Sequence, residues 1–121
     1  YNKEQFLYEL KENPVSNVAV IEYNGIVVGF YDYWHTFDSA TICQIAVSKL
    51  YRRLGLADLM LKDIIKDCYA KRVVNITLEV RTNNVAAIKL YEKNGFIKVL
   101  TKPQYYSNGD DAFYMVRKVE I

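Results

Sequence analysis

The segment 52–57, Arg-Arg-Leu-Gly-Leu-Ala, places two cations and two small residues where a strand pattern gives way to a helix pattern. The first turn of a helix carries unpaired N–H groups and the positive end of the helix dipole, and both attract an anion. Gly55 lets the backbone come close to that anion, while Arg52 and Arg53 add positive charge. The turn therefore predicts a phosphate-binding site. An ordinary turn with two solvated arginines is the alternative that these residues leave open.

Other sites built from short motifs are not indicated. Gly55 is not followed by Lys-Ser/Thr, which excludes a P-loop, and no Gly-x-Gly-x-x-Gly occurs. The chain has one histidine, His35, and two cysteines, Cys43 and Cys68, without a Cys-x-x-Cys pair, so we expect no zinc site. We expect both cysteines to be buried free thiols in a reducing compartment, and His35 to lie in a surface loop.

The first half of the chain predicts a short helix followed by three strands. An apolar stripe at helical spacing ends at Asn13-Pro14, which indicates the end of a helix. Two β-rich runs, 17–23 and 26–33, flank Asn24-Gly25, and this arrangement is the strongest short-range signal for a hairpin. After a polar loop, a third strand over 39–47 is expected to pair antiparallel with the second.

The second half predicts a strand-helix-strand unit and two closing strands. A helix over 55–71 is followed by a strand over 74–80, a helix over 84–94, and strands over 96–101 and 112–119. A crossover helix between two strands makes them parallel, with a right-handed connection. The fold class expected is therefore α/β, a single mixed sheet with helices against it. In the first of these helices we expect four charged residues to face water: Lys62, Asp63, Lys66 and Asp67.

Length and charge limit the classes of protein that the chain can represent. Its 121 residues fit one domain with a real hydrophobic core. A net charge of only +2 gives no reason to expect direct binding to nucleic acid. Without a signal peptide or an apolar run of about 18 residues, we expect neither secretion nor membrane insertion, and hence a cytoplasmic protein.

The phosphate-binding turn and its flanks resemble the GCN5-related N-acetyltransferase (GNAT) family, whose acetyl-CoA motif is Arg/Gln-x-x-Gly-x-Gly/Ala. Within that family they are most similar to the bacterial ribosomal-protein alanine N-acetyltransferases. The resemblance covers about residues 1 to 119. The linked motifs are Cys43-Gln-Ile-Ala-Val47, the turn 52–57, Leu78-Glu-Val-Arg81, Leu90-Tyr91-Glu92, Asn94-Gly95-Phe96, Tyr105-Tyr106 and Asp111-Ala112.

The resemblance implies a mostly antiparallel sheet whose central parallel strands splay apart to admit acetyl-CoA, with no metal. It implies a single N-acetyltransferase domain over 1–121 that lacks the family's first strand and first helix. Backbone groups of three residues would bind the pantetheine arm, and the turn would wrap the pyrophosphate. The implied cofactor-binding residues are Ile45, Ala46, Val47, Arg52, Arg53, Leu54, Gly55, Leu56, Ala57, Asp58, Asn84 and Tyr91.

The same resemblance implies that Glu79 is the general base and Tyr91 the general acid. A phenol with a pKa of about 10 protonates a thiolate of pKa about 8.5 reluctantly, so we expect Tyr91 to act mainly by hydrogen bonding. A free α-amine, with a pKa of about 7.7–8.0, needs less help from Glu79 than a lysine at about 10.4. From the residues alone, Glu79 could equally pair with Arg81 or with a nearby lysine.

The acceptor implied is a protein N-terminus, such as that of a ribosomal protein, used by a monomer or weak dimer. Two alternatives remain open: an acetyltransferase for small amines such as polyamines or aminoglycosides, and an acyl-CoA-binding module without turnover. Trp34, Tyr105 and Tyr106 are candidates for lining the acceptor groove, with plain packing as the alternative. Asp110 and Asp111 could attract a positively charged peptide terminus, but turn chemistry explains them as well.

Overall fold

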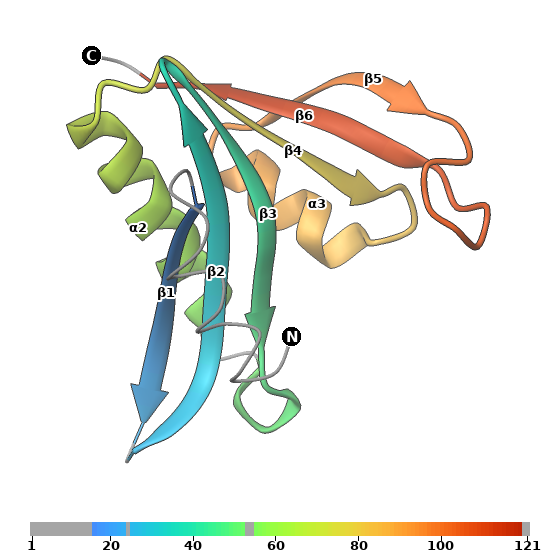
Figure 1. The fold of residues 1–121 in the computed structure, drawn as a ribbon. Coiled ribbons are helices and arrows are strands. Elements are labelled where there is room, and N and C mark those ends of the chain that lie inside the picture. Colours follow the sequence, from blue (N-terminus) through green and yellow to red (C-terminus); the bar gives the residue numbers. More distant parts are fainter. Residues whose placement is uncertain (1–15, 24, 53–54, 120–121) are drawn as a thin grey trace.

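The computed structural model describes residues 16–23, 25–52 and 55–119, and these form one six-stranded sheet with two α-helices (Figure 1). The helix predicted before Pro14 lies outside the described residues. The sheet order is β1-β2-β3-β4-β6-β5. In chain order the elements are β1 (Ser16–Tyr23), β2 (Ile26–Thr36), β3 (Ser39–Val47), the short 3-10 helix η1 (Lys49–Tyr51), α2 (Leu56–Ala70), β4 (Asn75–Arg81), α3 (Val85–Lys93), β5 (Ile97–Lys102) and β6 (Ala112–Lys118).

The predicted α/β class and the predicted hairpin are confirmed. β1 pairs antiparallel with β2, and β2 pairs antiparallel with β3. β3 and β4 are the one parallel pair among the described strands, and β6 lies between β4 and β5, antiparallel to both. The crossover through α2 makes β3 and β4 parallel, as the strand-helix-strand pattern predicted.

The parallel pair is short, and this separates the sheet into two halves. β3 and β4 pair only from Ser39–Asn75 to Thr41–Thr77. Beyond Thr41, β3 continues to pair with β2 while β4 continues to pair with β6. The carboxyl ends of β3 and β4 therefore diverge, as Figure 1 shows. The splayed strands expected from the family resemblance are present.

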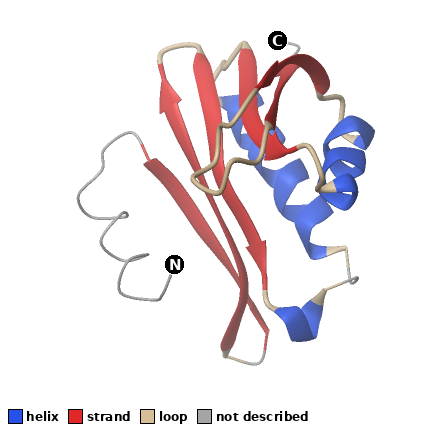
Figure 2. Ribbon diagram, turned by 90° about the vertical axis from the view of Figure 1, so that its right-hand side faces the viewer, coloured by secondary structure: helices blue, strands red, loops and turns tan. Residues whose placement is uncertain are grey.

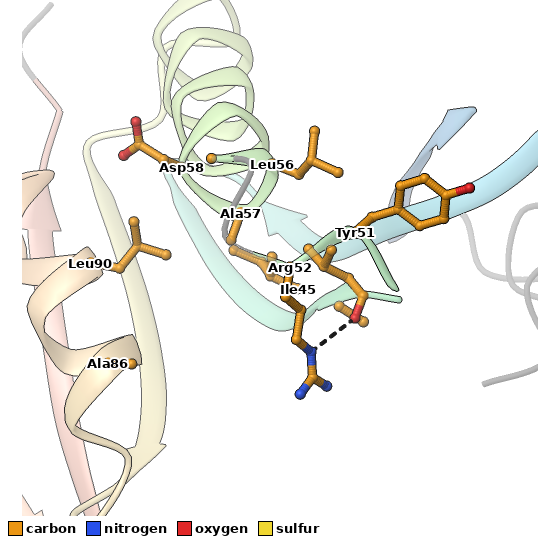
Figure 3. A pocket seen from close by; sticks show the side chains of 11 residues that line it. Ile45, Tyr51, Arg52, Leu56, Ala57, Asp58, Ala86 and Leu90 are labelled. Carbon is orange, nitrogen blue, oxygen red and sulfur yellow. Dashed lines mark hydrogen bonds between the residues drawn. The ribbon is translucent and has the colours of Figure 1, made fainter. Parts of the chain in front are cut away.

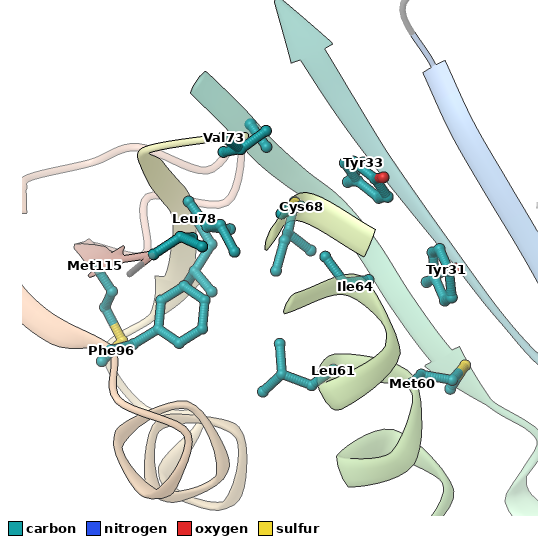
Figure 4. Packing of buried hydrophobic residues seen from close by; sticks show 14 of the residues in the cluster. Tyr31, Tyr33, Met60, Leu61, Ile64, Cys68, Val73, Leu78, Phe96 and Met115 are labelled. Carbon is teal, nitrogen blue, oxygen red and sulfur yellow. The ribbon is translucent and has the colours of Figure 1, made fainter. Parts of the chain in front are cut away.

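Both α-helices lie on the same face of the sheet (Figure 2). The apolar stripe of α2 is fully buried at Leu61, Ile64 and Cys68, and it packs against side chains of the sheet such as Leu78 (Figure 4). Burying a side chain of this size contributes about 1.5–3 kcal/mol to stability. None of the described helices is long and apolar enough to cross a membrane.

Two carboxylates of α2 bind tyrosines of the sheet rather than water alone. The Tyr31 hydroxyl donates to Asp63 Oδ2 at 2.8 Å, and the Tyr33 hydroxyl donates to Asp67. Lys71 Nζ lies 3.0 Å from Asp67 Oδ2 and also donates to the Tyr33 oxygen at 3.1 Å. Asp67 is partly exposed, as expected, but its carboxylate also joins α2 to β2.

These tyrosines predict a loss of stability at high pH. Burial raises the pKa of Tyr31 and of Tyr33, and the hydrogen bonds to Asp63 and Asp67 raise both further. Their neutral forms therefore stabilise the fold fully below about pH 10, where tyrosines of the unfolded chain ionise, and this contribution falls as the pH rises above it. Urea unfolding monitored from neutral pH upward should show the decline. Tyr31→Phe should make it shallower, and a decline of unchanged steepness would contradict the assignment.

Cys43 and His35 are placed differently from the expectation. Cys43 is exposed, because on β3 the buried positions are Ala40 and Ile42 and the alternation turns residue 43 to the face away from both α-helices. His35 lies in β2, which runs on to Thr36, and its Nε2 is 2.8 Å from the Phe37 carbonyl oxygen. The prediction of a buried Cys43 and that of a loop position for His35 are wrong.

The two thiols should therefore react at very different rates. Cys68 is fully buried, and burial raises the pKa of its thiol to about 11, so little thiolate forms near neutral pH. We expect a disulfide reagent to modify Cys43 in the folded protein and Cys68 only after denaturation. Mass spectrometry of peptides from native and urea-treated protein would locate the labels. Rapid labelling of Cys68 in the native protein would contradict this packing.

Candidate active site

A groove of about 510 Å³ opens where β3 and β4 separate, between the end of β3, the start of α2 and one side of α3 (Figure 3). Ligands of open α/β sheets bind in such crevices outside the carboxyl ends of parallel strands. The residues that line it are Ile45, Ala46, Val47, Tyr51, Arg52, Gly55, Leu56, Ala57, Asp58, Ala86 and Leu90.

Most of the predicted cofactor-binding residues are brought together in this groove. The end of β3 and the turn before α2 line it as expected, but Arg53 and Leu54 lie outside the described residues. Asn84 caps α3, because its Oδ1 accepts from the Ala87 N–H at 3.2 Å, and it does not line the groove. Tyr91 does not line it either, although the preceding residue does.

Three lining residues were missed: Tyr51, Ala86 and Leu90. Ala86 and Leu90 stand four residues apart in α3, so they share one side of the helix. This spacing was a usable signal for a helix side that faces a cleft. Tyr51 belongs to η1, and the sequence carried no clear sign of that turn of helix.

The amino end of α2 presents free backbone donors to the groove. Gly55 is the N-cap residue with φ of 76°, a left-handed conformation that suits glycine, and among the described residues no side chain caps the helix. The first N–H groups of α2 are therefore available to an anion. Arg52 lies at the same end, with its Nε donating to the Val47 carbonyl at 3.5 Å (Figure 3).

Asp58 places a negative charge in the first turn of α2, but neighbouring groups compensate it. Asn94 Nδ2 donates to Oδ1 at 2.8 Å, Lys62 Nζ lies 2.6 Å from Oδ2, and Lys93 Nζ lies 3.8 Å from the same oxygen. The hydrogen bonds from Asn94 and Lys62 lower the pKa of Asp58. The amino end of α2 thus remains suited to an anionic ligand.

Tyr91 lies in the last turn of α3, and its ring is half-buried against Phe96. The two rings meet edge to face, with centroids 5.8 Å apart. Burial raises the pKa of Tyr91, and the nearby Tyr106 adds a smaller effect in the same direction. Its hydroxyl therefore keeps its proton at neutral pH and can donate a hydrogen bond.

Glu79 lies on β4 beside the segment that joins β5 to β6. The Tyr105 hydroxyl donates to Glu79 Oε1 at 3.2 Å, and Lys102 Nζ is 4.0 Å from the same oxygen. Pairing with a nearby lysine was one alternative for this residue, and the structure shows that contact. Arg81, the other partner considered, instead bonds to Asp110 with Nε 3.2 Å from Oδ2.

Of the residues considered for the acceptor groove, the tyrosines and aspartates of the segment between β5 and β6 lie near Glu79 or Arg81, whereas Trp34 lies elsewhere on the sheet. Tyr105 and Tyr106 stack edge to face at 5.0 Å, close to Glu79. Asp110 bonds to Arg81, and its own N–H donates to Asn108 within the turn. Asp111 also makes a turn contact, because its Oδ1 accepts from the Gln104 N–H at 2.9 Å. Trp34, 42% exposed, lies on β2 opposite Thr41, so β3 separates it from β4.

Comparison with known proteins identifies the family. The model of the acetyltransferase (GNAT) family matches residues 1–96. The chain is a GNAT-family N-acetyltransferase. The ribosomal protein bS18-alanine N-acetyltransferase of Escherichia coli (strain K12) is 35% identical to this acetyltransferase over 101 residues, which are 81% of this chain and 68% of that protein.

Solved structures agree with the GNAT fold. The crystal structure of the Escherichia coli enzyme superimposes on this acetyltransferase with a TM-score of 0.88 and 29% identity, over 100% of this chain and 79% of the other. Ard1 from Thermoplasma volcanium superimposes with a TM-score of 0.88 and 31% identity, over 100% of this chain and 82% of Ard1. A GNAT acetyltransferase from Elizabethkingia anophelis, solved with acetyl-CoA bound, shares the fold with a TM-score of 0.81 and 18% identity. The match covers 97% of this chain and 83% of the other.

Proposed function

We propose that this acetyltransferase transfers the acetyl group of acetyl-CoA to the α-amino group of a protein N-terminus, such as that of a ribosomal protein. The observation that carries the proposal is the groove at the point where β3 and β4 separate, which opens onto the amino end of α2, where no described side chain forms a cap. The relative from Escherichia coli, named for acetylating an alanine of ribosomal protein bS18, supports the choice of acceptor.

The groove offers matching groups for the two ends of the cofactor arm. The end of β3, at Ile45, Ala46 and Val47, continues beyond the last pair with β4, so its backbone can hydrogen-bond a pantetheine amide. The N–H groups after Gly55 suit the pyrophosphate, and Arg52 adds a cation beside them. Together these groups would direct the thioester toward α3 and Tyr91.

The transfer itself needs a neutral amine and a stabilised thiolate. The amine nitrogen attacks the thioester carbonyl, a C–N bond forms and the C–S bond breaks. The proton lost by the amine goes to Glu79, directly or through water. The Tyr91 hydroxyl donates a hydrogen bond to the departing sulfur. Because a phenol is a weaker acid than a thiol by about 1.5 pKa units, full transfer of its proton costs about 2 kcal/mol or more, and the raised pKa of Tyr91 increases this cost.

An α-amine suits this site better than a lysine side chain. At neutral pH about a tenth or more of an α-amine is already neutral, whereas only on the order of 0.1% of a lysine is. Glu79 therefore needs to deprotonate a smaller fraction of the acceptor when the acceptor is an N-terminus. The ring pair of Tyr105 and Tyr106 beside Glu79 provides a surface against which the first residues of a peptide can lie.

Three acceptors offered separately with acetyl-CoA would test the proposal. A peptide with N-terminal alanine and an internal lysine, the same peptide with a blocked N-terminus, and spermine would be compared by mass spectrometry and by release of CoA. We expect acetylation of the free N-terminus alone. Preferential turnover of spermine would establish a small-amine enzyme, and cofactor binding without CoA release from any acceptor would establish a binding module.

A further inference from the structure

Lys102, the last residue of β5, reaches across to the proposed general base. Its Nζ lies 4.0 Å from Glu79 Oε1. The same ammonium lies over two aromatic rings, 5.3 Å from the centroid of Tyr105 and 4.9 Å from that of Tyr114. A carboxylate and two rings thus hold one ammonium group beside the position that an acceptor amine must approach.

The position of Lys102 matters for the protonation state in which the acceptor amine binds beside Glu79. A carboxylate close to an amine stabilises the ammonium form, which has no lone pair and cannot attack a thioester. Glu79 alone would therefore tend to bind the acceptor in its unreactive state. A fixed positive charge next to Glu79 acts in the opposite direction, because two ammonium groups beside one carboxylate repel each other.

We propose that Lys102 is a positioning residue that offsets the charge of Glu79, so that the acceptor site takes up the neutral amine in preference to the ammonium ion. This inference rests on the proposed N-terminal acetylation. It predicts that an N-terminus gives up a proton when it binds, before any chemistry takes place.

A second cation of this region, Arg81, already has partners. Arg81 pairs with Asp110, and its guanidinium carbon lies 3.9 Å from the centroid of the Tyr106 ring. Among the ion pairs of residues 16–23, 25–52 and 55–119, the one that involves Glu79 is with Lys102. The positive charge beside the proposed base is therefore that of Lys102.

Tyr105 and Tyr106 lie near Glu79, and burial raises the pKa of both hydroxyls, so both are neutral at pH 7. The Tyr105 hydroxyl donates a hydrogen bond to Glu79, and the pKa of Tyr105 is raised by burial first and then by the Glu79 charge, with a smaller effect from Cys43 on β3. Tyr114 lies opposite Glu79 on β6 and contributes its ring. Neither Tyr105 nor Tyr106 therefore carries a charge that could take over the role of Lys102.

Proton release on binding is the direct test. A peptide with N-terminal alanine would be titrated calorimetrically into the CoA-saturated protein at pH 7, in buffers of different ionisation enthalpy. Since the free amine is mostly protonated at this pH, we expect the unmodified protein to release about 0.8 protons or more per peptide. Lys102→Met should release less than half of that. Lys102→Arg, which keeps the charge, should restore it.

A turnover measurement separates this inference from the function on which it rests. In Lys102→Met the acidic limb of the kcat profile should move to higher pH by about half to one unit, and Lys102→Arg should not move it. Lys98→Met, on the same strand with its Nζ over the Phe113 ring, is the control and should behave as the unmodified protein.

The outcomes are distinct. If the unmodified protein acetylates the peptide but Lys102→Met matches it in proton release and pH profile, the inference on Lys102 is wrong and the proposed function stands. If the unmodified protein neither binds nor acetylates the peptide, the proposed function fails, and the inference fails with it. Circular dichroism of each variant would confirm that the fold is retained.

Discussion

Tyr91→Phe should lower kcat about 10²-fold or more and leave the affinity for acetyl-CoA within about twofold of the unmodified protein. The substitution removes only the hydroxyl, so the departing thiolate loses its hydrogen-bond donor. The ring contact with Phe96 at 5.8 Å is kept, and the fold should therefore be unaffected. Single-turnover acetylation kinetics and calorimetric titration with CoA would measure the two effects separately.

Tyr69→Phe is the matched control for this change. Tyr69 is an exposed tyrosine of α2, 56% accessible, and it does not line the groove. We expect its variant to keep full activity. A fully active Tyr91→Phe would show that the thiolate leaves without help from this hydroxyl, and the role assigned to Tyr91 would be wrong.

Gly55→Val should weaken the binding of acetyl-CoA about tenfold or more, which corresponds to about 1.4 kcal/mol. Gly55 has φ of 76°, where an L-residue costs about 1–2 kcal/mol and a β-branched one more. A Cβ added there meets no atom of the described residues within 4 Å apart from its neighbours in the chain, so a branched side chain would project into open space at the edge of the groove. Both effects disturb the amino end of α2, and calorimetry with CoA would measure the loss.

Gly25→Val is the control that distinguishes the effect of backbone strain from the effect of a side chain placed at the groove. Gly25 lies in the turn between β1 and β2 with φ of 78°, and an added Cβ there also meets no atom within 4 Å in the part of the chain that the structure describes, its chain neighbours aside. The two variants should lose similar stability in thermal unfolding, yet only Gly55→Val should lose affinity for CoA. Equal affinity in both would mean that the cofactor phosphates do not bind at the start of α2.

The two substitutions report on different parts of one site. Tyr91→Phe should change kcat with binding unchanged, and Gly55→Val should change binding first. A variant that lowered both by the same factor would indicate a general loss of structure. The pair therefore tests whether the amino end of α2 holds the cofactor while α3 supplies the hydrogen bond at the reacting sulfur.

The sequence by itself predicted most of the elements and most of the residues that line the groove, because both depend on neighbours in the chain. Apolar spacing placed α2, Asn-Gly placed the turn of the first hairpin, and the run from Arg52 to Asp58 lines the groove largely as predicted. The start of α2, Gly55 and the adjacent Arg52 lie within one or two helical turns of each other in the chain. A local sequence pattern is therefore sufficient to predict this part of the groove.

Only the tertiary structure decided what surrounds the two proposed catalytic groups and how charges are compensated. Tyr105 meets Glu79 across 26 positions of the chain, and Asn94 meets Asp58 across 36. Such contacts depend on strand order and on which face each residue takes. No short pattern contains that information. For the same reason the exposure of Cys43 could not be predicted, since alternation along β3 gives two faces and only the packed helices determine which of them is buried.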